Sequence, residues 1–107
     1  MINKQKALDD FQISEQDYDE MLAEFIAQAA EKITGIEGSL LNGNVQEAEH
    51  HAHSLKGVAG NLRLDACYSI ATTIDNALRN SPPLPIEAHL VDLKKAIDEI
   101  RLSIRSM

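Results

Sequence analysis

The residues best suited to chemistry lie in one run, Glu49 to Leu62, where a histidine is followed by a lysine and two glycines. If the run is helical, at about 100° per residue, Lys56 lies about 60° to one side of His53 and Gly57 about 40° to the other. Gly60 lies within about 20° of the histidine, two turns further on. The run therefore predicts an imidazole that shares its helical face with a cation and two positions without side chains.

A histidine on such a face is a candidate nucleophile. Neutral imidazole is available near neutral pH, and a lysine ammonium one turn away can hold the oxygens of a phosphoryl group. Taken alone, an exposed histidine beside a lysine is typical of plain solvated surface. Whether His53 is a reactive site or ordinary surface therefore depends on the role of the two glycines.

Glycine inside a helix costs about 0.5 to 1 kcal/mol relative to alanine, so Gly57 and Gly60 need a reason. One reason is close helix packing, which would place them on the apolar stripe that runs through Leu55 and Ala59. The other reason is access, because a bare position lets another protein approach the helix closely. Both glycines fall beside the stripe, toward solvent, so we predict that they leave His53 open to a partner.

The run AHSLKGVAGNL, from Ala52 to Leu62, closely resembles the signature of histidine-containing phosphotransfer (HPt) domains of two-component phosphorelay signalling. In that signature a histidine is followed by two residues, a Lys-Gly pair and a small residue three further on. His53, Lys56, Gly57 and Gly60 match it residue by residue.

The resemblance covers most of the chain, from about Phe11 to Ile104, including the segment EMLAEFIAQAAEKI before the motif and ACYSIATTIDNALR after it. One departure follows the motif, where the family commonly has glycine and then alanine and this chain has Arg63 and Leu64. This long basic side chain bears on the choice of partner rather than on the transfer chemistry.

The resemblance implies a phosphorelay intermediate without stand-alone catalytic activity. His53 would accept a phosphoryl group through Nε2 from a receiver-domain aspartate and pass it to another receiver domain, while Lys56 stabilises the phosphoryl oxygens. The implied partners are response-regulator receiver domains and a sensor or hybrid histidine kinase. No cofactor or metal is expected in this chain, because the Mg²⁺ belongs to the receiver. The residues expected to give access and docking are Gly57, Gly60, Glu49, His50, Asn61 and Arg63.

Four apolar stripes at helical spacing would position this motif, and they predict an all-α protein. The expected bundle helices span about 14–41, 45–62, 65–79 and 85–105, with a short N-terminal lid helix at about 3–11. Stripes of similar length joined by short loops predict an antiparallel four-helix bundle. The stripes are Tyr18, Leu22, Phe25, Ala29, Ile33, Ile36 and Leu40; Val45, Ala48, Ala52, Leu55, Ala59 and Leu62; Cys67, Ile70, Ile74 and Ala77 or Leu78; and Ile86, Leu90, Leu93, Ile97, Ile100 and Ile104.

Start signals precede each of these helices. Ser14 is expected to cap the first, and Asn44 with Glu47 resembles a capping box for the second. Asp65 is expected to cap the third helix, and Pro85 fits the first turn of the fourth, where its missing amide costs nothing.

Two other functional classes compete with the relay. Metal binding would use His50 and His53, with Glu49, but two or three ligands from one helix make a weak site. A structural adaptor bundle would explain the helices and leave the lysine and glycine beside His53 unexplained. The remaining histidines, His51 and His89, are expected to be solvated side chains, like His50 if it binds no metal.

Composition narrows the setting of the protein. The 107 residues suit one domain spanning 1–107, and a net charge of −7 with a pI near 4.9 disfavours nucleic acids and membrane surfaces as partners. Cys67 is the only cysteine, so no internal disulfide can form, and its place on an apolar stripe predicts a core residue. No apolar stretch fits a signal peptide or a bilayer span, so we expect the protein in the cytoplasm. We expect a monomer, because no apolar surface suited to dimerisation is evident from the sequence.

Overall fold

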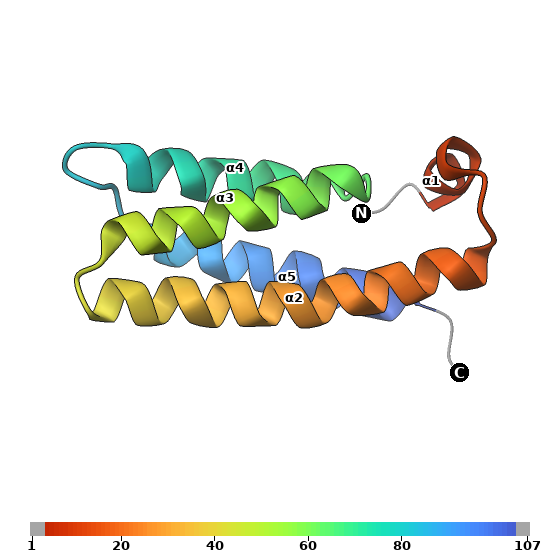
Figure 1. Cartoon of the computed structure of the whole chain (residues 1–107), viewed down its shortest axis with the longest axis horizontal. Helices are drawn as coiled ribbons and strands as arrows, with labels where there is room; N and C mark the ends of the chain where they lie inside the picture. Colours follow the sequence, from red (N-terminus) through yellow and green to blue (C-terminus); the bar gives the residue numbers. More distant parts are fainter. Residues whose placement is uncertain (1–3, 105–107) are drawn as a thin grey trace.

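The computed structural model describes residues 4–104, which form helices and no strand. The helices are α1 (Lys4–Phe11), α2 (Glu15–Leu41), α3 (Val45–Asn61), α4 (Asp65–Arg79) and α5 (Glu87–Ser103). Both α2 and α4 pack against α3 and against α5, so these four helices close a ring around the core. Successive bundle helices run in opposite directions along the long axis, and α1 lies at the end where α2 begins (Figure 1). The prediction of an all-α bundle is confirmed.

The core consists of the predicted stripes, with small shifts of phase. Every stripe residue of α2, α3 and α5 is buried except the end residues Leu40, Val45 and Ile104, which are half-buried. In α4 the buried face turns slightly, so that Ala71 is buried and Ile70 is half-buried. The same rotation of the buried face of α4 buries Asp75, a carboxylate in the middle of an apolar face.

Two of the predicted helix starts are confirmed by side-chain caps. Ser14 Oγ accepts a hydrogen bond from the Asp17 amide at 3.1 Å, at the start of α2. Asn44 Oδ1 accepts from the Glu47 amide at 3.0 Å, and its Nδ2 donates to the Glu47 carboxylate at 3.0 Å. Each cap satisfies an amide that the helix itself leaves without a partner.

The cap predicted for α4 is wrong by one residue, although its predicted span of 65–79 is confirmed, and the start predicted for α5 is wrong by two residues. The cap of α4 is Leu64, whose side chain is buried and makes no capping hydrogen bond, and Asp65 is the first helical residue. Helix α5 begins at Glu87 and not at Pro85. The chain before it stays outside the helix, since the Leu84 amide donates to the Ala77 carbonyl at 3.0 Å at the end of α4. The predicted ends of the lid helix at residue 3 and of the last helix at residue 105 lie outside the described residues.

Helix α1 is tied to the bundle end by ion pairs, a hydrogen bond and contacts of the Phe11 ring with Arg63 and Tyr18. Lys4 Nζ lies 2.6 Å from Asp19 of α2 and donates to the Ser103 carbonyl of α5 at 3.0 Å. Arg63, just after α3, pairs with Asp10 at 3.5 Å and lies over the Phe11 ring, 5.2 Å from its centre. The lid therefore covers the end at which α3 finishes.

The end of α3 is also fixed from inside the core. The Tyr18 hydroxyl donates to the Leu62 carbonyl at 2.7 Å, which satisfies a carbonyl at the helix C-terminus. Burial raises the pKa of Tyr18, so the hydroxyl stays protonated and able to donate.

Within residues 4–104 no helix is both long enough and apolar enough to cross a lipid bilayer.

Candidate functional site

His53 lies on the outer face of α3, in the middle of the helix. Its neighbours Ala52 and Leu55 are buried in the core, and this phase turns the histidine outward. The side chain is 58% exposed. A second molecule can therefore reach the ring from solvent, as the sequence predicts.

One nitrogen of the His53 ring faces α4. His53 Nδ1 lies 3.3 Å from Oδ2 of Asp75, whose side chain is only 1% exposed. If Nδ1 carried a lone pair, two acceptors would face each other at a buried carboxylate, which is costly. Arg79 Nη2 also lies 3.3 Å from Nδ1, but this guanidinium has the carboxylates of Asp75 and Glu49 as acceptors and does not need the lone pair. The contact is therefore assigned as Nδ1–H donating to Asp75, which leaves the lone pair of neutral imidazole on Nε2.

Arg79 links the carboxylates behind the histidine. Its Nε donates to Asp75 Oδ1 at 3.1 Å, and both Nε and Nη2 lie 3.4 Å from Glu49 Oε2 on α3. The same Nη2 is 3.3 Å from His53 Nδ1. The guanidinium thus stands between two acids from neighbouring helices and balances part of their charge.

The pKa of Asp75 is lowered from its ordinary value. Desolvation in the buried position acts to raise the pKa, but it is outweighed by the hydrogen bond with His53 and by the positive charge of Arg79, which also holds the neighbouring Glu49 carboxylate. Asp75 is therefore an ionised acceptor at neutral pH, which supports the assignment of the proton to Nδ1.

Lys56 lies one turn beyond His53 on α3 and is half-buried. Its ammonium forms no hydrogen bond or ion pair with any residue of the described range 4–104. A cation without a partner, one turn from the imidazole, is available to an incoming anion.

The two glycines of the motif have different surroundings. A Cβ placed on Gly57 would meet nothing within 4 Å, so this position is open, as the access interpretation requires. A Cβ on Gly60 would lie 3.1 Å from Cδ1 and 3.2 Å from Cε1 of the Tyr68 ring on α4. The expectation that Gly60 is bare toward solvent is therefore wrong, because an aromatic ring packs on it.

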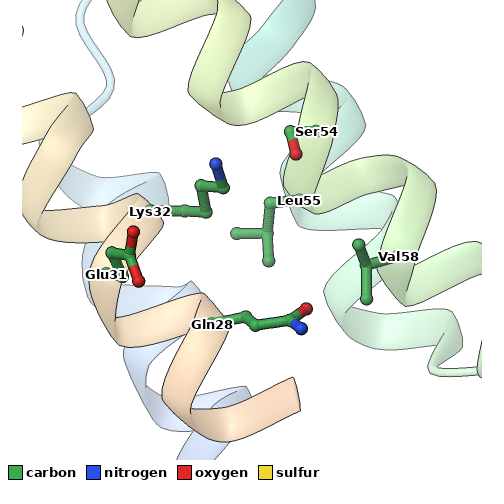
Figure 2. Close-up of a pocket in the computed structure, with 6 residues that line it drawn as sticks. All are labelled: Gln28, Glu31, Lys32, Ser54, Leu55 and Val58. Atoms are coloured by element: carbon green, nitrogen blue, oxygen red, sulfur yellow. The ribbon is translucent and has the colours of Figure 1, made fainter. Parts of the chain in front are cut away.

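A shallow cleft of about 300 Å³ runs between α2 and α3, on the flank of α3 away from α4. Leu55 and Val58 give it an apolar wall, and Ser54, which follows His53, lies at its edge (Figure 2). Its α2 side is polar and is formed by Gln28, Glu31 and Lys32.

A family model for the Hpt domain matches residues 20–103, which is most of the chain. The chain belongs to the Hpt domain family. Histidine phosphotransfer in two-component phosphorelays is the function of this family, and its partners are receiver domains and histidine kinases. No curated protein and no solved structure gives a significant match.

The other residues that the sequence assigned to docking in this Hpt domain are placed unequally. His50 and Asn61 are exposed on α3. Glu49 is half-buried and bound to Arg79, and Arg63 is engaged with the lid helix α1. Of these four, only His50 and Asn61 present a free side chain on the face of His53.

The prediction that His51 is a solvated side chain is wrong. It turns toward α2 and is half-buried, with its ring so close to Gly35 that a Cβ there would lie 2.8 Å from Nε2. Its Nε2 is 3.7 Å from the Glu47 carboxylate. His89, also expected to be solvated, is half-buried on α5, whereas Cys67 is buried as predicted.

Sequence reasoning missed Asp75 and Arg79, the two residues of α4 that contact His53. Glu49, His53 and Asp75 each offer one potential ligand atom within 4.8 Å of the others. This set differs from the one considered for the alternative of metal binding, because it contains Asp75 and lacks His50. The guanidinium of Arg79 already stands beside both carboxylates, and its charge disfavours a cation at the same place.

Proposed function

We propose that His53 of this Hpt domain accepts a phosphoryl group from the aspartyl phosphate of one receiver domain and passes it to the aspartate of another. The observation that carries the proposal is the contact of Nδ1 with buried Asp75. It leaves Nε2 as the nucleophilic atom, on the exposed face and beside the open position of Gly57.

In the first transfer the Nε2 lone pair attacks phosphorus in line with the departing oxygen. The bond from phosphorus to the aspartate oxygen breaks, and its electron pair stays with the receiver's carboxylate. The imidazole gains positive charge as the nitrogen–phosphorus bond forms. Asp75, which holds the Nδ1 proton, stabilises this charge from the buried side.

The second transfer reverses these steps. A receiver aspartate attacks the phosphorus, the nitrogen–phosphorus bond breaks, and the electron pair returns to Nε2. Lys56 is proposed to stabilise the phosphoryl oxygens in both directions, since its ammonium is otherwise without a partner in the described part of the chain. The chain needs no cofactor of its own in this scheme, because the receiver supplies the Mg²⁺.

The test is transfer of ³²P from a panel of phosphorylated receiver domains to the parent protein and to His53→Gln. The parent is expected to become labelled with at least one receiver. The label should be lost in acid and kept in alkali, as for a phosphoramidate. His53→Gln is expected to take up no label, and label of undiminished amount on this variant would contradict the assignment.

His50 provides the matched control. It is exposed on the same helix and contacts neither Asp75 nor Arg79 among the described interactions. His50→Gln is expected to be labelled like the parent. Loss of label from both variants to the same extent would mean that the reaction does not single out His53.

A further inference from the structure

Tyr68 is the exposed aromatic side chain nearest to the reactive face along the α3–α4 seam. It is 42% exposed, whereas the other aromatic residues of the chain are buried or half-buried. Its ring packs on Gly60, so α3 supports it from beneath. Its hydroxyl makes no hydrogen bond within residues 4–104, while the Tyr68 carbonyl accepts one from Thr72. The Cδ1–Cε1 edge of the ring lies against Gly60, and the rest of this half-exposed side chain, with its free hydroxyl, faces solvent.

The position of this ring relative to His53 follows from helix geometry. Gly60 lies two turns beyond His53, about 10 Å along the axis and within about 20° of it around the helix. Tyr68 crosses from α4 to cover that point. Standard protein interfaces bury about 800 Å² on each partner, which corresponds to a flat disc of about 16 Å radius. A contact area of that size centred on His53 reaches the Tyr68 ring.

We propose that Tyr68, seated on Gly60, is an anchor residue for the receiver domain that docks over His53. The inference rests on the proposed phosphotransfer function and adds a residue of α4 to the docking surface. Aromatic side chains dominate the energetics of many interfaces, especially when they are surrounded by contacts that exclude water. A ring already held against a neighbouring helix also loses little conformational freedom on binding.

The other exposed apolar side chains have a different relation to the site. Val91 is 51% exposed but belongs to α5, which packs on α2 and α4. Its exposed surface is on the side of the bundle away from α3. Val91 is therefore a control of similar exposure that a receiver centred on His53 does not reach.

The experiment measures initial transfer rates against the concentration of a receiver domain that phosphorylates the parent protein. The variants are Tyr68→Ala, Tyr68→Phe and Gly60→Ala, with Val91→Ala as the control. Each protein is also labelled with phosphoramidate, a small donor that phosphorylates imidazole with loss of ammonia and needs no docking surface.

Tyr68→Ala is expected to raise the KM for the receiver by about tenfold or more, with kcat and phosphoramidate labelling unchanged. Tyr68→Phe should keep most of the affinity, because the ring remains. Gly60→Ala should raise KM by less, since its methyl group displaces the ring by only a few tenths of an ångström. Val91→Ala should match the parent.

Two failures can be told apart. If the parent exchanges with receivers and Tyr68→Ala has the same KM, the anchor is wrong and the phosphotransfer function stands. If no receiver labels the parent, the proposed function is wrong and the anchor fails with it. Tyr68→Ala protein that loses phosphoramidate labelling as well would also overturn the anchor, because the residue would then act on the site or the fold.

Discussion

The surroundings of His53 differ between the two flanks of α3. On the α4 flank the ring contacts Asp75, and Arg79 links this acid to Glu49, so the histidine is held by buried and charged groups. On the α2 flank Gly57 is open, and the adjoining cleft has an apolar wall and a polar rim. One flank fixes the ring and its proton, and the other leaves room for a partner. A carrier needs both, because it must present a defined nucleophile to an incoming protein.

The largest expected effect comes from closing the open flank with Gly57→Gln. Glutamine favours a helix interior over glycine, so the free energy of unfolding should rise by a few tenths to about 1 kcal/mol. Phosphotransfer from receivers should collapse, because the new side chain rises one turn from His53 and blocks the approach. Thermal melts and transfer rates measure the two effects separately.

Gly38 of α2 gives the matched control, since a Cβ there also meets nothing within 4 Å. Gly38→Gln should stabilise the domain similarly and leave transfer unchanged. A Gly57→Gln protein that melts at a lower temperature and transfers normally would show that Gly57 serves helix packing. The α2 flank of α3 would then not serve as the approach path for a partner.

The next effect comes from the closed flank. Asp75→Asn keeps the size of the side chain but removes the charge that faces Nδ1 and Arg79. Transfer should slow by at least about tenfold, since the positive charge on the imidazole loses its stabilising acid. The free energy of unfolding should fall by about 1 to 3 kcal/mol, because Arg79 loses a charged hydrogen bond at a buried acceptor. Unchanged transfer would mean that Asp75 serves only the fold.

Lys56→Ala should affect the reaction more than the fold. The side chain has no partner among residues 4–104, so the free energy of unfolding should change by no more than about 0.5 kcal/mol. Transfer should slow by up to about tenfold, less than the roughly 10²-fold or greater loss typical of a preorganised donor in a water-excluded site. Rates at saturating receiver check this, and equal rates would remove Lys56 from the proposed chemistry.

The smallest effect is the response of stability to acid. The pKa of Asp75 is lower in the folded chain than the roughly 3.9 of an unfolded one. Its stabilising contribution is therefore complete above that value and is lost as the pH falls through the folded pKa. Urea unfolding between about pH 2 and 6 should show a shallower loss of stability for Asp75→Asn than for the parent. Parallel curves would mean that the network does not shift this carboxyl.

The motif of α3 could be predicted because its residues are local. His53, Lys56 and Gly57 lie within one turn and a half, so helix geometry alone fixes their relation. Asp75 and Arg79 lie 22 and 26 residues after His53, on another helix. Their contact depends on how α4 is rotated against α3, which no local pattern determines. One signal was present, since Asp75 interrupts an apolar stripe between Ile74 and Leu78.

The surroundings of single residues limited the sequence analysis in the same way. The sequence alone does not distinguish Gly60 from Gly57. Only the packing of α4 against α3 places the Tyr68 ring on Gly60 and leaves Gly57 open. His51 was predicted to be solvated, but Gly35 on α2 makes room for its ring. The bounds of the helices were predicted to within one or two residues, because apolar stripes and capping residues are properties of short segments of sequence.

The hydrogen bond from His53 to Asp75 has a consequence for the turnover of the relay. In the proposed cycle the Nδ1 proton stays on the same atom before, during and after each transfer, since the buried acid keeps it there. The ring therefore needs no tautomer exchange through bulk water between receiving a phosphoryl group and being ready for the next.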